Sequence, residues 1–170
     1  MDDCYFCKSI QQGSGLDFIS DLETELFVAA WDVNPATPGH ALVIPKHHVQ
    51  YMRNLSVNEQ ENLIKLIIAA KDYIEHVDLE NVYKEMVRRM ASTKSEGFIN
   101  LALARLQSAS RPPEAFNDGL NDGPAAGQTV PHFHWHIMPR WQGDIADPRG
   151  GIRHMFPGMG NYHDGISATA

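Results

Sequence analysis

The sequence predicts a single α+β domain in which an antiparallel sheet of about five strands is packed against helices. Short runs rich in β-branched and aromatic residues, which favour strands, occur in both halves of the chain, and apolar residues recur at helical spacing between them. The 170 residues suffice for one domain with its own core, and 43% hydrophobic against 21% charged residues is ordinary for a soluble globular protein.

The first strands are expected before the longest helix. Residues 22–31 predict two strand segments that meet at a turn, and residues 41–44 predict a short apolar strand that Pro45 ends. The intervening residues 32–40 contain two prolines and a glycine, so we expect a loop there.

Helices are expected in the middle of the chain. Ser56 and Glu59 have the spacing of a capping box, and the helix that they begin should run to about His76 and cover one side of the sheet. Its apolar residues at helical spacing are Leu63, Ile64, Ile67, Ile68 and Ile74. Within residues 78–115, spacings of four predict a second helix through Met86, and residues 98–106 predict a third.

A strand is expected to start at residues 115–118, and the strongest pattern of the chain follows it. His132, His134 and His136 alternate with aromatic and aliphatic residues. A period of two predicts a strand with the three imidazoles on one face and the apolar side chains on the other. Residues two apart on one face lie roughly 7 Å from each other, so three imidazoles can serve one small polar group.

Two other interpretations of these histidines are open. The first is a half-buried strand with a solvated polar face. It explains three alternating histidines poorly, because each buried imidazole needs a partner and charged forms repel one another. The second is a metal site built from all three, since histidine is a common metal ligand.

The motif His-Phe-His-Trp-His-Ile-Met at residues 132–138 resembles the signature of the histidine triad (HIT) superfamily of nucleotide hydrolases and transferases. Residues 121–130 resemble the loop that precedes the triad in that family. The similarity extends over most of the chain, which we expect to form a single HIT domain over residues 1–170. Residues 78–115 match poorly and are expected to be a longer helical insert, and residues 154–170 are expected to be a tail.

The chemistry of a phosphoanhydride favours a nucleophilic role for the middle histidine. Attack by water meets negative charge, whereas a neutral imidazole is a good nucleophile near neutral pH. We predict that one nitrogen of His134 attacks the α-phosphorus while a backbone carbonyl holds its other N–H, as the resemblance also implies. His136 is expected to donate a hydrogen bond to the phosphoryl group, and His132 to be structural. No catalytic cofactor is required for this route.

The resemblance implies a hydrolase of dinucleoside polyphosphates such as diadenosine tri- or tetraphosphate. Two alternatives stay open. One is a nucleoside phosphoramidase or nucleotidyl transferase that uses the same chemistry. The other is a nucleotide-binding sensor whose triad binds without useful turnover.

Residues for nucleotide binding are expected before the triad. Glycines at residues 119, 123 and 127 let the backbone approach a ligand, so the N–H groups near Gly127 can form an anion nest to which Asn121 and Thr129 add donors. Gln128 belongs to the same Gly-Gln-Thr segment. The resemblance implies that Asp32 binds both ribose hydroxyls, as a carboxylate can accept two O–H bonds.

Two arginines after the triad, Arg149 and Arg153, are candidates for contacts with the outer phosphates, although each is equally suited to be a surface cation.

Cys4 and Cys7 have the C-x-x-C spacing of a metal or redox pair. A tetrahedral zinc site needs two more ligands, and His48 and His132 are the candidates. Some HIT proteins are similar in pairing a C-x-x-C with two later histidines, and this resemblance selects His48 over His47. We therefore predict a structural Zn²⁺ on Cys4, Cys7, His48 and His132.

The net charge of −7 with neutral histidines predicts no general attraction to nucleic acid or anionic lipid. No apolar run approaches the length of a membrane span, and the acidic N-terminus is unlike a signal peptide, so we expect a cytoplasmic protein. The resemblance also implies a homodimer.

Overall fold

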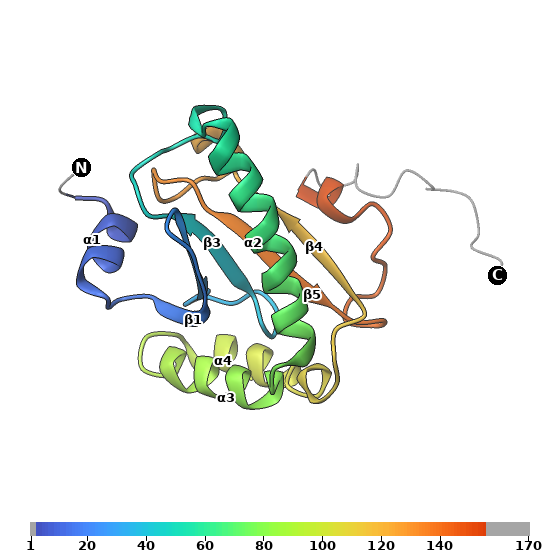
Figure 1. Ribbon diagram of the computed structural model, residues 1–170. Coiled ribbons are helices and arrows are strands. Elements are labelled where there is room, and N and C mark those ends of the chain that lie inside the picture. Colours follow the sequence, from blue (N-terminus) through green and yellow to red (C-terminus); the bar gives the residue numbers. More distant parts are fainter. Residues whose placement is uncertain (1–2, 156–170) are drawn as a thin grey trace.

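Five antiparallel strands form one sheet in the order β1-β2-β3-β5-β4 in the computed structural model, which describes residues 3–155 (Figure 1). The strands are β1 (Asp17–Glu23), β2 (Phe27–Trp31), β3 (Ala41–Pro45), β4 (Ala115–Gly119) and β5 (Trp135–Arg140). The predicted α+β class with about five strands is confirmed. The strand order places β5, which carries the last histidine of the triad, in the interior of the sheet between β3 and β4.

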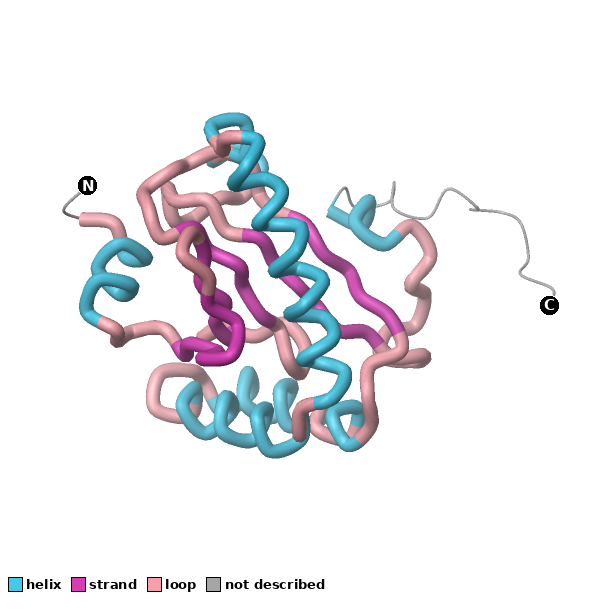
Figure 2. Tube along the Cα trace, in the orientation of Figure 1, coloured by secondary structure: helices cyan, strands magenta, loops and turns pink. Residues whose placement is uncertain are grey.

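Helices surround the sheet, as Figures 1 and 2 show. Helix α2 (Val57–His76) crosses one face of the sheet, α1 (Tyr5–Gln12) lies beside the first strands, and α3 (Leu79–Met90) and α4 (Glu96–Ala104) lie together below one end of it. The predicted capping box starts α2, since the Ser56 side chain accepts a hydrogen bond from the Glu59 N–H and the Glu59 carboxylate accepts one from the Ser56 N–H at 2.7 Å. No helix of residues 3–155 is long and apolar enough to cross a membrane.

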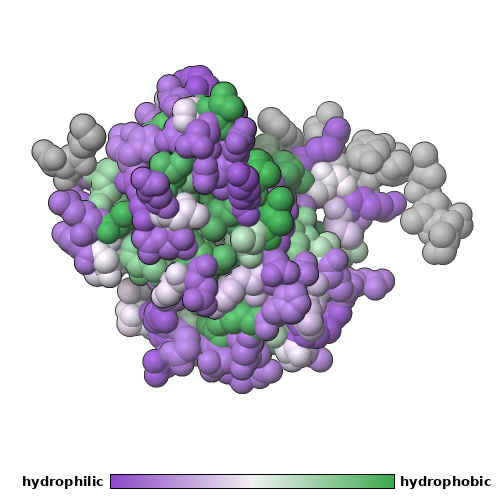
Figure 3. Space-filling model, in the orientation of Figure 1, coloured by the Kyte–Doolittle hydropathy of each residue, from purple (hydrophilic) through white to green (hydrophobic). Residues whose placement is uncertain are grey.

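The buried face of α2 differs from the predicted one. Its buried residues are Leu63, Leu66, Ile67, Ala70 and Ile74, whereas Ile64 is 50% exposed and Ile68 is 64% exposed. These two residues lie four apart on a neighbouring stripe of the helix, which the sheet does not reach. Apolar side chains interrupt the polar surface over and beside α2 (Figure 3).

Strand β5 starts at Trp135, three residues later than the predicted strand that begins at His132. The His132 N–H bonds locally to the Val130 carbonyl at 2.8 Å, and the Phe133 N–H bonds to the Val49 carbonyl at 2.6 Å. These two N–H groups therefore bond to loop carbonyls and not to a neighbouring strand. The side chains of residues 132–137 still alternate between the two faces.

The alternation divides the interior in two. Phe133, Trp135 and Ile137 pack in the main core beneath α2. A second, smaller core on the opposite face contains Phe6 of α1 and Leu42 of β3. Because His136 pairs with Leu42 across the sheet, its side chain lies on this second face, away from α2.

Candidate functional site

His136 lies in a row of cross-strand neighbours on the face away from α2. Its neighbour on β3 is Leu42, and its neighbour on β4 is Gly119. Because Gly119 has no side chain, the sheet is open beside the imidazole, and a Cβ atom built there would meet only the tip of Ile152 at 4.0 Å. A cavity of about 350 Å³ occupies this space and is lined by His136, His40, Gly119 and Asn121 among others.

His134 is 7% exposed and lies next to this cavity without lining it. Its Nδ1 is 2.8 Å from the His132 carbonyl oxygen, so Nδ1 carries the proton and Nε2 keeps a free lone pair. The ring meets Phe6 edge-on, with the ring centres 5.1 Å apart, and meets His136 in the same way at 4.9 Å. The middle histidine is therefore held in one tautomer and one orientation beside His136, as the sequence predicted for the N–H group.

His40 fixes the tautomer of His136. The Ala36 N–H donates to His40 Nδ1 at 3.1 Å, so the proton of His40 is on Nε2. That Nε2–H donates to His136 Nδ1 at 2.9 Å, and the proton of His136 must then be on its Nε2. Burial lowers the pKa of His136 to about 4, with the nearby His40 and His134 adding to the shift and Asp32 opposing it. Near pH 7 His136 is a neutral ring whose Nε2–H is a hydrogen-bond donor.

Asp32 lies at the other side of the two histidines. One carboxylate oxygen accepts a hydrogen bond from the Asn34 N–H at 2.8 Å, and the other is 3.5 Å from His40 Nδ1 and 3.9 Å from His136 Nδ1. Burial lowers the pKa of His40, although the carboxylate of Asp32 opposes this shift. Asp32 also lines a separate cavity of about 300 Å³ together with Tyr5 and Met86.

The predicted nucleotide-binding residues before the triad lie in three different environments. Asn121 lines the cavity beside His136. Gln128 instead supports the backbone, since its side-chain amide donates to the Gln50 carbonyl at 3.0 Å and to the His132 carbonyl at 3.4 Å. Gly127 and Thr129 are exposed and do not line the cavity, although Gly127 has a φ of 92° and lies against the Asn121 side chain.

Of the two arginines considered for the outer phosphates, Arg149 forms a two-bond ion pair with Asp147, at 2.9 Å for each bond. The predicted tail begins within the short helix at Gly151–Met155, and its remaining residues lie outside the part of the chain that the structure describes.

Cys4, Cys7, His48 and His132 come together as predicted, with their ligand atoms all within 4.8 Å of one another. His132 Nδ1 is 3.4 Å from the Cys4 sulfur and 3.5 Å from the Cys7 sulfur, and His48 Nδ1 is 3.3 Å from the Cys7 sulfur. His132 Nε2 donates to the Pro45 carbonyl at 2.9 Å, which leaves Nδ1 unprotonated and directed at the sulfurs. A donor set of two thiols and two imidazoles fits tetrahedral Zn²⁺.

The neighbouring His47 points elsewhere, with its Nδ1 3.2 Å from a Glu59 carboxylate oxygen. Burial is the main cause that raises the pKa of the Cys7 thiol to about 11, and the nearby Cys4 adds to it. A cation would be needed to hold the Cys7 sulfur as a thiolate at neutral pH.

The alternative of one metal ion bound by all three triad histidines disagrees with these positions. His132 Nδ1 faces the cysteines, His134 Nδ1 is bonded to a backbone carbonyl and His136 Nδ1 is bonded to His40. A different set, Asp32, His40 and His136, also has its ligand atoms within 4.8 Å of one another. An ion there would have to displace the direct bond between the two imidazoles.

Sequence reasoning did not assign a role to His40 or Phe6. His40 is 4% exposed and orients His136 from 96 positions away in the chain, and only its place in the Pro-Gly-His segment hinted at it. Phe6 packs between His132 and His134, with ring centres 5.7 Å and 5.1 Å away.

The sequence of the chain matches a known protein family. The HIT domain family matches residues 21–143 of the chain. The chain belongs to the HIT family. A HIT-like protein of Borreliella burgdorferi is 29% identical over 144 residues, which cover 85% of this chain and 80% of the relative.

Two relatives with named activities come from Schizosaccharomyces pombe. An asymmetrical bis(5′-nucleosyl)-tetraphosphatase is 32% identical and the match covers 73% of this chain and 50% of that protein, so the chain spans half of its length. An adenosine 5′-monophosphoramidase is 29% identical, with 81% of this chain and 74% of that protein covered.

Solved structures of HIT proteins share the fold. A HIT family protein of Bacillus anthracis has a TM-score of 0.56 at 28% identity, over 82% of this chain and 74% of that one. A zinc-bound histidine triad family protein of Mycobacterium smegmatis has a TM-score of 0.53 at 27% identity, over 86% of this chain and 81% of that one.

Proposed function

We propose that the protein hydrolyses dinucleoside polyphosphates at the α-phosphate through a covalent nucleotidyl intermediate on His134. The observation that carries this proposal is the hydrogen bond of His134 Nδ1 to the His132 carbonyl, because it leaves the Nε2 lone pair free for attack on phosphorus. The relative named as a tetraphosphatase supports the substrate class.

The reaction would proceed in two displacements. The Nε2 lone pair of His134 forms a bond to the α-phosphorus, and the bond from phosphorus to the bridging oxygen breaks, with its electron pair leaving on the departing phosphate. Water then attacks the same phosphorus, the N–P bond breaks, and the imidazole recovers its lone pair as the water loses a proton to solvent. The products are a nucleoside monophosphate and the remaining nucleotide.

His136 would stabilise the charge that develops in both displacements. The His136 imidazole is neutral at pH 7 because its pKa is about 4, and its Nε2–H is a hydrogen-bond donor beside the cavity. His40 would act as a positioning residue that keeps this proton on Nε2 through the 2.9 Å bond. Asn121, which lines the same cavity, is a second candidate donor to the phosphoryl oxygens.

The ribose would bind at Asp32, whose side chain is 14% exposed and borders the cavity that contains Tyr5. The loop before the triad would help to bind the nucleotide through Gly127, Gln128 and Thr129. For Gln128 this means holding the His132 carbonyl, which in turn orients His134.

Structural Zn²⁺ is proposed on Cys4, Cys7, His48 and His132. The zinc-bound relative of known structure supports the proposal, as does the soft tetrahedral donor set. The ion would cross-link α1 to the segment before β5, and so would fix the position of the His132 carbonyl that holds His134.

A homodimer is also proposed. Ile64 and Ile68 on α2 are apolar and half or more exposed, which suits a contact with a second copy of the chain. Light scattering after size-exclusion chromatography measures this directly, and a mass of one chain at micromolar concentration would contradict it.

Adenosine 5′-monophosphoramidate hydrolysis is the second candidate, favoured by the relative that carries that name. Purified enzyme should be offered diadenosine tetraphosphate and adenosine 5′-phosphoramidate side by side. We expect a larger kcat/KM for the tetraphosphate, with AMP and ATP as products. Turnover of the phosphoramidate alone would favour the second candidate, and binding of AMP without turnover of either substrate would favour a sensor.

A further inference from the structure

The face of β5 that carries His136 continues past it. Met138 and Arg140 follow at steps of two residues, so their side chains lie on the same face of the sheet, roughly 7 Å and 14 Å further along. Asn117 of β4 is paired with Met138 and extends this surface sideways. A ligand whose phosphorus is at His134 and His136 therefore has a continuous surface along which its departing part can lie.

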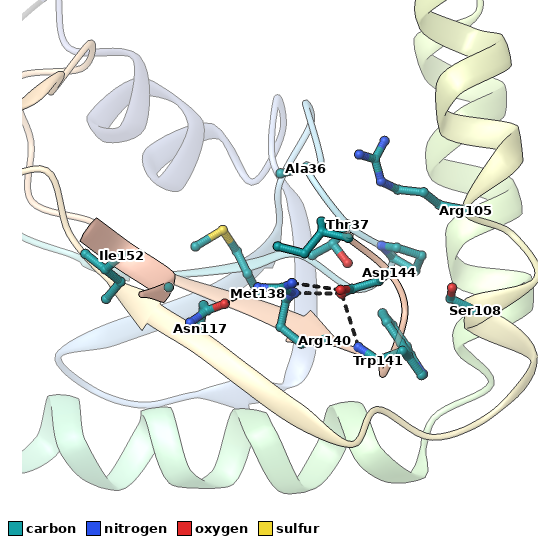
Figure 4. Close-up of a pocket in the computed structure, with 13 residues that line it drawn as sticks. Ala36, Thr37, Arg105, Ser108, Asn117, Met138, Arg140, Trp141, Asp144 and Ile152 are labelled. Atoms are coloured by element: carbon teal, nitrogen blue, oxygen red, sulfur yellow. Dashed lines mark hydrogen bonds and ion pairs between the residues drawn. The ribbon is translucent and has the colours of Figure 1, made fainter. Parts of the chain in front are cut away.

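A further cavity, of about 240 Å³, covers this surface (Figure 4). Its walls are the row from Met138 to Arg140, the loop around Thr37, and the segment after α4 that carries Arg105 and Ser108. It shares Met138 and Ile152 with the cavity beside His136, so the two cavities adjoin.

Of the two arginines that line this cavity, one is paired with a carboxylate and the other is not. Arg140 forms a two-bond ion pair with Asp144, at 2.6 Å and 2.7 Å, and also donates to the Asn117 side chain. Three of the five donors of its guanidinium are thereby used, and its charge is compensated. Arg105 is exposed, and no carboxylate in the described part of the chain forms an ion pair with it. The cavity therefore has one uncompensated positive charge at its rim.

Much of the remaining wall is apolar, although Thr37, Ser108 and Asn117 contribute polar side chains. Met138, Trp141, Ile145 and Ile152 line the cavity together with two small residues of the loop before β3. The Arg105 guanidinium has no carboxylate partner in the described chain, and its Nη1 donates to the Leu101 carbonyl at 3.5 Å. A cavity that combines this guanidinium with a largely apolar floor suits a group with a phosphate linkage and a flat, weakly polar ring. A leaving group as small as ammonia would make no use of it.

We propose that this cavity binds the leaving nucleotide of a dinucleoside polyphosphate, with Arg105 contacting its phosphates. This inference rests on the proposed function, and it deepens it by assigning the departing half of the substrate to a site. The ribose bound at Asp32 and the leaving nucleotide would then lie on opposite sides of His136.

The helical insert supplies part of this site. Arg105 and Ser108 both belong to residues 78–115, the region that the sequence predicts to be a longer helical insert. The insert therefore acts on substrate choice: it contacts the half of the substrate that leaves and has no contact with the attacking imidazole.

The test compares two substrates with very different leaving groups. We would measure kcat/KM for diadenosine tetraphosphate and for adenosine 5′-phosphoramidate in wild-type protein, Arg105→Ala and Ser108→Trp. Arg88→Ala is the matched control, because Arg88 is also an exposed arginine of the insert, is paired with Glu85 at 2.6 Å, and does not line the cavity.

Loss of one charged hydrogen bond to phosphate lowers kcat/KM for the tetraphosphate about tenfold in Arg105→Ala, with the phosphoramidate unchanged. Ser108→Trp, which places a large ring in the cavity, should give at least the same loss with the same selectivity. Arg88→Ala should match wild type with both substrates.

The inference fails if both variants keep the wild-type kcat/KM for the tetraphosphate, and also if they lose both substrates equally. In either case an active wild-type enzyme leaves the proposed function standing. If wild-type protein turns over neither substrate, the proposed function falls and this inference falls with it.

Discussion

His132 and His136 stand on either side of His134, and burial lowers the pKa of both to about 4. Their surroundings differ completely. His132 is 0% exposed and faces two cysteines and His48, whereas His136 is 21% exposed in its side chain and faces His40, Asp32 and an open cavity. The residue type and the pKa are therefore the same at the two positions, and the neighbours alone separate the proposed metal ligand from the proposed donor to the substrate.

The different surroundings of His132 and His136 also explain why His134 is suited to the proposed attack on phosphorus. It takes its backbone carbonyl partner from the His132 side and its aromatic neighbour from the His136 side. The hydrogen bond to the His132 carbonyl thus fixes Nδ1, and the ring packs against His136, which lines the cavity. Variants on the two sides of His134 separate these two contributions.

His134→Ala should reduce turnover of dinucleoside polyphosphate by roughly 10⁴-fold, because the nucleophile is lost. Nucleotide affinity should stay close to wild type, since the cavity is lined by His40, His136 and Asn121. Steady-state kinetics and calorimetric titration with AMP measure the two quantities. Turnover within tenfold of wild type would place the nucleophile elsewhere.

His48→Ala should abolish zinc binding, whereas His47→Ala should keep one Zn²⁺ per chain. The two residues are neighbours, but only His48 faces the Cys7 sulfur, at 3.3 Å, while His47 faces Glu59. Loss of the ion should cost about 3 kcal/mol or more, which lowers Tm by roughly 10 °C. Elemental analysis of protein purified without added metal, with Tm on the same samples, measures both effects. Wild-type protein that contains no zinc would contradict the proposed metal site.

Stability should fall as the pH drops from 6.5 towards 4, in part through His136. Its pKa is lowered from 6.5 to about 4 in the folded protein, so within this window the unfolded chain binds more protons and acid favours unfolding. Above pH 6.5 neither state is protonated and the contribution vanishes. The loss for this residue reaches about 3 kcal/mol at most.

Urea unfolding of wild type and His136→Gln at pH 7.5 and pH 4.5 isolates this effect. The variant should lose less stability over the interval, because the glutamine does not titrate, while the acid sensitivity of the cysteine–histidine cluster is common to both proteins. Equal losses in the two proteins would show that His136 is not buried as a neutral ring.

Ser56→Ala should have the smallest effect and serves as a reference for both regions. It removes the capping box of α2 and should cost about 1 kcal/mol. Zinc content and kcat/KM should not change, because α2 lies on the opposite face of the sheet from both clusters. A change in either would mean that general loss of stability, and not the local site, governs those measurements.

Much of the fold was predictable because its signals are local. The Ser56–Glu59 capping box lies within one turn of α2, and Leu63, Ile67 and Ile74 recur at helical spacing within this one helix. The start of β5 was wrong by three residues because it depends on the distant bond from Phe133 to Val49, which no local pattern reveals. Burial of Ile64 and Ile68 was wrong for a related reason, since the sheet reaches only one stripe of the helix.

The site was predictable where its residues are adjacent in the sequence or share a motif. The triad and the cysteine pair were recognised in this way, but the tautomer of His136 depends on His40, which is 96 positions away. The cavity beyond Met138 depends on where the helical insert packs, which the sequence of residues 78–115 alone does not determine. Contacts between distant segments are thus the part of the site that only the three-dimensional structure supplies.

The most direct measurement is mass spectrometry of enzyme quenched in acid-free denaturant within milliseconds of mixing with diadenosine tetraphosphate. We expect a mass increase of one adenylate group on the peptide that contains residues 132–140, assigned by fragmentation to His134, and its absence in His134→Ala. An adenylate on another residue, or complete turnover of substrate with no covalent adduct at any time point, would contradict a nucleophilic His134.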